Sequence, residues 1–131
     1  MYILLVSGSR VGVPEGLVNA VLTAHHNLAH EKGLEFVIMH GCARGVDSQA
    51  EAYANWNGVR TLQYPADWHL YDKRAGSIRN GRMAQQCCDF ATNGHVTACA
   101  AFPRGASYGT RNMIKQFNSK CGDAQVWEVP D

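Results

Sequence analysis

Residues 2–10 read YILLVSGSR, an unbroken apolar run that ends in a glycine, a serine and an arginine. A run that is apolar at every position, and not only at alternate ones, is typical of a parallel strand covered on both faces. A glycine directly after such a strand lets the backbone turn sharply and approach a ligand closely. This stretch therefore predicts a buried strand over 2–7 that leads into a candidate binding loop.

Further apolar runs alternate with stretches of helical spacing along the rest of the chain. Strands are expected at 35–40, 59–64, 96–102 and 124–129. Helices are expected from Pro14 to Gly33 and over 47–57, 79–88 and 109–120, with Asp47 as an N-cap and 65–78 as a loop. Regular alternation of strand and helix predicts a single α/β domain over 1–131, a three-layer Rossmann-like arrangement with a five-stranded parallel sheet between helices.

The composition fits an ordinary globular domain of 131 residues, with 46% hydrophobic and 18% charged residues. A net charge of +1 gives no general reason for binding to nucleic acid or membranes. No apolar stretch reaches the roughly 18 residues of a membrane span, and the N-terminus lacks the basic region of a signal peptide. The five cysteines form no C-x-x-C pair, so reduced thiols in a cytoplasmic protein are expected. No cofactor is predicted and no metal site, because His26 and His30 lack a third ligand.

Glycine and arginine occur together in four segments placed after the predicted strands, at 8–10, 41–45, 76–80 and 104–110. In open α/β sheets, ligands bind outside the carboxyl ends of the strands. Backbone N–H groups, helix starts and the guanidinium fork all suit phosphate. Eight cations are expected in or beside the loops at this edge: Arg10, Arg44, Lys73, Arg74, Arg79, Arg82, Arg104 and Arg111. Such a cluster in a nearly neutral chain favours an anionic small molecule over a nucleic-acid duplex.

The aromatic residues divide into candidates for stacking and candidates for packing. Trp68 and Tyr71 in the predicted loop, and Tyr108 in the last glycine-rich loop, could stack on a base. Their alternative role is to cover the core or to form a dimer contact. Trp56 and Trp127 are interpreted as packing residues, and His40 is expected to have a structural role more than an acid–base role.

Taken in order, these loops resemble the SLOG superfamily, which includes cytokinin-activating LOG phosphoribohydrolases, the DNA-processing protein DprA and small YspA/YpsA-related proteins of bacteria and phages. The resemblance is closest to the last group and covers nearly the whole chain. It rests on GSR at 8–10, HGCARGVD at 40–47, PADW at 65–68, AG at 75–76 with RN at 79–80, and FPRG to GT over 102–110. It implies a sheet of order 3-2-1-4-5, a homodimer or higher homo-oligomer, and a protein of the cytoplasm of a bacterial or phage-infected cell.

The resemblance also implies a nucleotide-type ligand across the loops after the first and fourth strands. The ligand-binding candidates are Gly8, Ser9, Arg10, Gly41, Arg44, Gly45, Asp67, Trp68, Arg79, Asn80, Pro103, Arg104, Gly105, Ser107, Gly109 and Thr110. Arg79 resembles the catalytic arginine of LOG enzymes, which cleave the N-glycosidic bond of nucleoside 5′-monophosphates.

The LOG carboxylate has no counterpart here, because Arg111, Asn112 and Met113 follow Gly109-Thr110. Cleavage through an oxocarbenium-like transition state needs such a group. Asp47 is the tentative substitute, and Glu51 and Asp67 are alternatives. The leading hypothesis is therefore a module that binds, senses or sequesters a nucleotide. The alternatives are a phosphoribohydrolase with a relocated carboxylate and a DprA-like binder of single-stranded DNA, for which an extended basic and aromatic track would be needed.

Overall fold

The computed structural model describes residues 1–131, and its five strands form one all-parallel sheet of order β3-β2-β1-β4-β5. The strands are β1 Tyr2–Gly8, β2 Phe36–His40, β3 Arg60–Gln63, β4 Val96–Phe102 and β5 Gln125–Val126. Both the α/β class and the predicted order 3-2-1-4-5 are confirmed.

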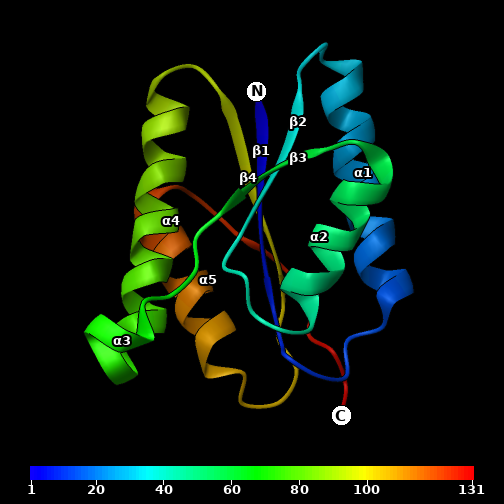
Figure 1. The fold of residues 1–131 in the computed structure, drawn as a ribbon. Helices are drawn as coiled ribbons and strands as arrows, with labels where there is room; N and C mark the ends of the chain where they lie inside the picture. The colour runs from blue at the N-terminus through cyan, green and yellow to red at the C-terminus, as the bar shows by residue number, and fades with distance from the viewer.

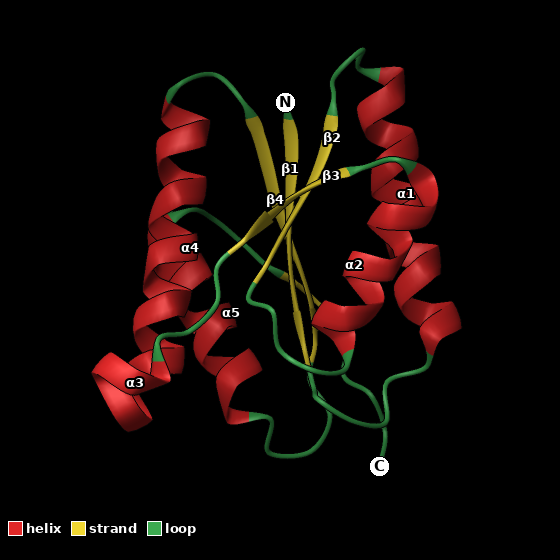
Figure 2. Ribbon diagram, viewed as in Figure 1, coloured by secondary structure: helices red, strands yellow, loops and turns green.

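Helices cover both faces of the sheet, so the fold has three layers with the sheet in the middle (Figure 1, Figure 2). The helices are α1 Glu15–Glu31, α2 Val46–Asn57, α3 Trp68–Tyr71, α4 Ala75–Thr92 and α5 Tyr108–Lys120, with a 3₁₀ turn, η1, over Asp72–Arg74. Helices α1 and α2 pack together on one face, and α4 and α5 pack together on the other. None of these helices combines the length and the apolar composition that a membrane crossing requires.

The central strand β1 contributes to both cores because its side chains alternate between the two faces. Tyr2, Leu4 and Val6 belong to the core under α1 and α2. Ile3 and Leu5 belong to the core under α4 and α5. All five side chains are buried, which explains why the sequence is apolar at every position of this strand.

Strand β1 lies between two parallel strands, β2 and β4. The connections that follow β1 and β4 run to helices on opposite faces of the sheet. Strand β1 pairs with β4 from Tyr2↔Val96 to Gly8↔Phe102 and with β2 from Tyr2↔Phe36 to Leu5↔Met39. After β1 the chain runs to α1 on one face, whereas after β4 it runs to α5 on the other. Diverging connections of this kind open a crevice at the carboxyl edge of the sheet.

The segment 65–78, predicted as a loop, is largely helical, and this prediction was wrong. Asp67 caps α3 by accepting the Leu70 N–H at 3.0 Å, and η1 then continues directly into α4 at Ala75. Gly76 was interpreted as a loop residue, but it lies inside α4, where the ring of Trp68 packs close to its Cα. A Cβ at this position would meet the Trp68 ring at an ordinary van der Waals distance of 3.5 Å, so this glycine neither ends the helix nor is required by the contact.

Two further predictions also need correction. The last strand spans only Gln125–Val126, with a separate bridge between Arg104 and Val129 extending the parallel pairing. Trp56 is not a packing residue, because it lies on the outer side of α2 and is 91% exposed. Trp127 does pack, with its ring stacked on Phe102 at a centroid distance of 5.2 Å.

Helix α2 begins differently from the prediction. Gly45, not Asp47, is the N-cap residue, with φ 78° and ψ −121°. This conformation is available almost only to glycine. A Cβ at Gly45 would overlap the backbone of Ser9 and Arg10 in the loop after β1. The glycine therefore lets two loops of the sheet edge lie in direct contact.

A buried histidine links α1 to two strands. His25 is 5% exposed, its Nδ1 accepts the Tyr2 hydroxyl at 2.6 Å, and its Nε2 donates to the Gln125 side chain at 2.9 Å. One ring nitrogen accepts and the other donates, and only the neutral imidazole offers one acceptor and one donor. Burial holds the pKa of His25 below its usual value, against the opposing effect of the Gln125 hydrogen bond.

We predict that His25 makes the fold less stable in mild acid. Because its pKa is lowered in the folded state, the unfolded chain binds more protons once the pH falls below about 6.5. The free energy of unfolding should therefore be highest near neutral pH and decrease from about pH 6.5 downward. Urea unfolding at pH 7.5 and pH 5.5 measures this. His25→Gln should reduce the pH dependence, and an unchanged dependence in that variant would contradict the assignment.

We also predict that Gly45→Ala is far more damaging than Gly58→Ala at the other end of the same helix. Gly58 also has a positive φ of 65°, but nothing lies within 4 Å of a Cβ placed there. Gly58→Ala should therefore cost about 1–2 kcal/mol from backbone strain alone. Gly45→Ala adds a collision with the loop after β1 and should cost about 3 kcal/mol or more. Equal losses in urea unfolding would show that the contact between the loops does not matter.

Candidate functional site

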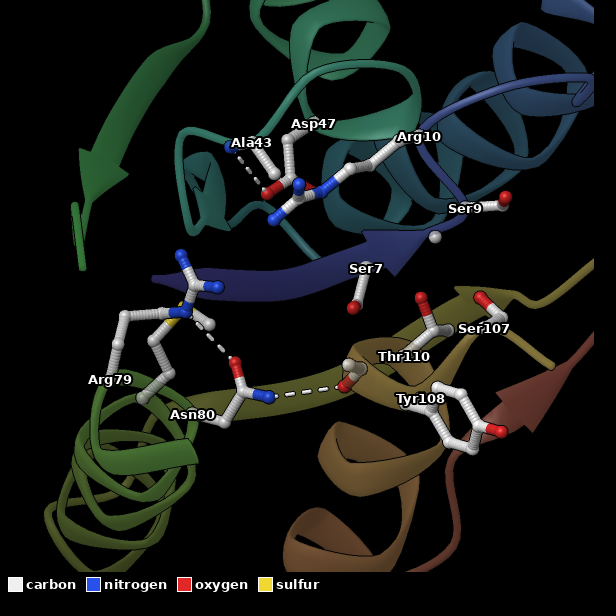
Figure 3. Close-up of a pocket in the computed structure, with 13 residues that line it drawn as sticks. Ser7, Ser9, Arg10, Ala43, Asp47, Arg79, Asn80, Ser107, Tyr108 and Thr110 are labelled. Atoms are coloured by element: carbon white, nitrogen blue, oxygen red, sulfur yellow. Dashed lines mark hydrogen bonds between the residues drawn. The ribbon is translucent and has the colours of Figure 1, made fainter. Parts of the chain in front are cut away.

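A cavity of about 370 Å³ opens at the carboxyl edge of the sheet, where β1 and β4 end (Figure 3). Its volume lies in the range of ligand pockets. Four segments form its wall: the end of β1 with its loop, the loop before α2 with the start of that helix, the start of α4 and the start of α5 with its N-cap residue. The lining residues are Ser7, Gly8, Ser9, Arg10, Ala43, Asp47, Arg79, Asn80, Met83, Ser107, Tyr108, Gly109 and Thr110.

Arg79 and Asn80 enter the cavity from α4 and are fixed by hydrogen bonds. The Arg79 guanidinium donates from Nη1 to the Gly41 carbonyl and from Nε to Asn80 Oδ1 at 2.9 Å. Asn80 is 3% exposed, and its amide donates to the Gly109 carbonyl and to Asn112 Oδ1, both at 3.1 Å. Asn80 thus connects the arginine of α4 to the first turn of α5.

Gly41, directly after β2, is the residue on which the Arg79 side chain packs. The Arg79 side chain lies directly on the Cα of Gly41, where any Cβ would displace the guanidinium. Gly41 was predicted to bind a ligand, but the structure places it behind Arg79 and not on the cavity wall. Its local role is to let the arginine approach the end of β2.

Arg10 reaches into the cavity from the loop after β1, and Figure 3 shows its side chain extending toward Asp47. The three ion pairs of the chain involve His40, Arg60 and Arg111. Arg10 and Arg79 are therefore both without a carboxylate partner. Two unpaired guanidinium groups on one cavity give it a positive potential.

Helix α5 supplies the opposite wall with its N-terminus. Ser107 is the N-cap residue, but its side chain caps no N–H group, and its φ of 40° is unusual for a residue other than glycine. The N–H groups of the first turn are therefore free to bind an anion. Thr110, in that turn, is only 4% exposed, and its hydroxyl has no partner in the protein and faces the cavity (Figure 3).

Asp47 is the one carboxylate on the cavity wall. Its Oδ2 accepts the N–H groups of Gly41 and Ala43, each at 3.1 Å, so it holds the loop before α2 and does not cap that helix. Burial raises the pKa of Asp47, although these two N–H groups and the charges of His40 and Arg79 act in the opposite direction. Burial also lowers the pKa of Arg79, while Asp47 opposes that change.

The other carboxylates considered as substitutes lie elsewhere. Glu51 accepts from His40 Nε2 at 2.7 Å and from Gln63 Nε2 at 2.8 Å. Because of these hydrogen bonds, the pKa of Glu51 is lowered. His40 is 2% exposed, and its Nδ1 accepts the Cys42 N–H at 3.0 Å, which fits the structural role predicted for it.

Part of the glycine-rich loop after β4 faces the C-terminal tail and not the cavity. Pro103 is buried, and its carbonyl accepts the Val129 N–H at 2.9 Å. The Arg104 side chain packs on Gly12 and donates to the Pro130 carbonyl at 3.4 Å. Gly105 likewise lies outside the cavity wall. Of this segment, only Ser107, at the end of the loop, and Tyr108, Gly109 and Thr110, in the first turn of α5, line the cavity.

The eight cations that were predicted to lie together at this edge make different contacts, and most of them do not line the cavity. Arg111 forms a bidentate pair with Glu128, at 2.7 and 3.0 Å, and also bonds the carbonyls of Gly105 and Ala106. Arg82 lies over the Tyr71 ring at 5.6 Å. Arg44 is exposed and is absent from the cavity wall. Of the eight, only Arg10 and Arg79 line the cavity.

Asp67 and Trp68 were also predicted to bind the ligand, but they lie outside the first cavity. Asp67 lines a second cavity, which Arg79 lines as well. Trp68 is 50% exposed and lines an open groove with Leu70 and residues of η1. Neither residue contributes to the wall of the first cavity.

Four residues on the cavity wall were not among the predicted site residues: Ser7, Ala43, Met83 and Tyr108. Ser7 was assigned to the strand, although it is the only polar residue in an apolar run and Figure 3 shows its hydroxyl directed into the cavity. Met83 follows Arg79 by one helical turn, so the same face of α4 presents both. Tyr108, considered only as a stacking residue, is 85% exposed at the rim.

The comparisons with known proteins agree with this picture. A model of the YspA, cpYpsA-related SLOG family matches residues 2–71. The Gene 61 protein of Mycobacterium phage D29 is 32% identical over 118 residues, which cover 86% of this chain and 85% of that protein. The family match includes the segments that contribute Arg10 and Asp47 to the cavity, and it suggests a nucleotide-related, Rossmann-like function. The chain belongs to the YspA, cpYpsA-related SLOG family.

Proposed function

We propose that the cavity between β1, α4 and α5 binds a nucleotide or a nucleotide-derived ligand by its phosphate, and that the protein acts as a sensing or sequestering module. The observation that carries the proposal is the pair of unpaired arginines, Arg10 and Arg79, facing the uncapped N-terminus of α5 across one cavity. Arg60 and Arg111 have carboxylate partners, and of the cations without one only Arg10 and Arg79 line this cavity.

Phosphate chemistry suits each group on this wall. Guanidinium donors form charge-assisted hydrogen bonds with phosphate oxygens. The free N–H groups of the first turn of α5 point along the helix axis and add the positive end of its dipole. The Thr110 hydroxyl can donate a further hydrogen bond, and the small side chains of Ser7, Ser9 and Ser107 leave room for the ligand.

The residues of α5 support a binding role. The first turn of this helix contains Arg111 and Asn112 and no carboxylate. The ligand can therefore be held by its phosphate without an acidic group from that helix beside its glycosidic bond. A role in sensing or sequestering a nucleotide fits this chemistry.

We predict that Arg10→Ala and Arg79→Ala each weaken the binding of adenosine 5′-monophosphate. Loss of a hydrogen bond to a charged group costs about 1.5–3 kcal/mol, which corresponds to roughly a tenfold to hundredfold rise in Kd. Isothermal titration calorimetry, with ligand-induced thermal stabilisation as a second readout, measures the effect. Arg60→Ala is the matched control, because Arg60 is exposed and pairs with Glu35 away from the cavity. Unchanged binding in both variants would remove the cavity from the proposal.

A specific observation also favours a second candidate, N-glycosidic cleavage of nucleoside 5′-monophosphates. The loop carboxylate of LOG enzymes is absent, but Asp47 brings a carboxylate to the same cavity from the first turn of α2. Its Oδ2 is held by two N–H groups, and its Oδ1 makes no hydrogen bond within the protein. An oriented carboxylate of this kind could stabilise positive charge on the ribose in the transition state.

For this candidate, the expected result is release of free base by the wild-type protein and loss of release in Asp47→Asn. Asparagine keeps an oxygen acceptor for the N–H groups of Gly41 and Ala43, so the loop should keep its shape. Chromatography of nucleoside monophosphates after incubation measures the base. Calorimetry on the same variant checks that the ligand still binds. If the wild-type protein returns bound nucleotide unchanged, the hydrolase is excluded and the binding module stands.

A further inference from the structure

A second cavity of about 220 Å³ lies beside the first and shares Arg79 with it. It is formed by the segment after β3, by the α3–η1 region and by the first turns of α4. Both cavities therefore lie along the carboxyl edge of the sheet, one at β1 and β4 and the other at β3. The side chain of Arg79 stands between them.

The lining of this second cavity differs in character from that of the first. Tyr64 and Tyr71 supply two aromatic rings, and Pro65, Ala75 and Ile78 supply apolar side chains, whereas the only aromatic residue of the first cavity is Tyr108. Gln63, Asp67, Arg79 and Arg82 complete the lining with hydrogen-bonding groups. Aromatic rings beside hydrogen-bonding groups are suited to a planar heterocyclic base.

The two tyrosines are held in place by different contacts. Tyr64 packs against the core under α4 and α5, and burial raises the pKa of its hydroxyl, which therefore stays protonated near neutral pH. The Tyr71 hydroxyl accepts from Arg82 at 3.1 Å, while the same guanidinium lies over its ring at 5.6 Å. A ring that is already ordered loses little conformational freedom when a ligand stacks on it.

Arg79 can donate hydrogen bonds to ligand groups in either cavity, because it lines both. Two of its five N–H donors are used, one by the Gly41 carbonyl and one by Asn80 Oδ1. The other three have no acceptor within the chain. The oxygens of a sugar or a phosphate placed next to the guanidinium can accept these donors.

On the basis of the proposed phosphate site, we infer that the second cavity receives the planar base of the ligand, so that a nucleoside monophosphate spans Arg79 with its phosphate at α5 and its base between Tyr64 and Tyr71. A cavity of about 220 Å³ is smaller than the usual pocket for a whole ligand, which fits a compartment for one part of it. The ribose then lies beside Arg79, between the two compartments.

Tyr108 is the competing place for the base, and its surroundings are less suitable. It is 85% exposed at the outer rim of the first cavity, so a base stacked on it would keep its other face in water. In the second cavity a base could contact Tyr64, Tyr71 and Ile78 together. More apolar surface would be removed from water there than on one exposed ring, which favours binding.

The test compares ribose 5-phosphate with adenosine 5′-monophosphate, which differ by the base, in calorimetric titrations of the full chain. The wild-type protein should bind both and should bind the nucleotide more tightly. Tyr71→Ala should raise the Kd of the nucleotide by about tenfold, as expected for loss of one base–aromatic stack, and leave that of ribose 5-phosphate unchanged. Tyr71→Phe keeps the ring and should keep the tighter binding of the nucleotide.

The outcomes separate this inference from the function on which it rests. If neither compound binds the wild-type protein, the phosphate site itself is wrong and the inference falls with it. If ribose 5-phosphate binds and the nucleotide binds no better, the phosphate site stands and the base compartment is refuted. The compartment is also refuted if Tyr108→Ala, and not Tyr71→Ala, removes the advantage of the nucleotide. Circular dichroism and thermal unfolding confirm that each variant is folded.

Discussion

Strand β1 is paired on both sides and buried on both faces, and the position of the candidate site depends on this constraint. A strand held by two parallel neighbours and two cores has little freedom at its end. The loop that follows it therefore delivers Ser9 and Arg10 to a defined place beside the loops of β2 and β4. Gly45 tightens this arrangement, because its missing side chain lets the loops after β1 and β2 touch.

The fold could be predicted from local patterns, because a strand that is buried on both faces, such as β1, needs apolar residues at successive positions and is recognisable from them. The boundaries of β4 also agree with the prediction, although only its second half is fully buried. The helical segment after Asp67 could not be predicted, since it depends on one capping hydrogen bond and on Trp68 packing against Gly76. Proline and glycine at either end of this segment are more often found in loops.

The candidate site was predictable to the level of its loops but not to that of individual side chains. The loops after β1, β2 and β4 and the start of α4 all contribute to the cavity, as their glycines and arginines indicated. Sequence alone could not show that Arg104 and Arg111 would be used by the last residues of the chain, because those partners are distant in sequence. Arg104 and Arg111 are therefore structural, whereas Arg10 and Arg79 have no carboxylate partner and line the cavity.

The attachment of the C-terminal tail has a practical consequence for work with this protein. Arg111 bonds Glu128 and the carbonyls of Gly105 and Ala106, so one side chain joins the tail to the loop that leads into the first turn of α5. The two chain ends lie at opposite ends of the molecule, with Asp131 on the side of the site and Met1 on the far side (Figure 1). An affinity tag or fluorophore attached after Asp131 would therefore lie on the side of the cavity, whereas the same group attached before Met1 would lie away from it.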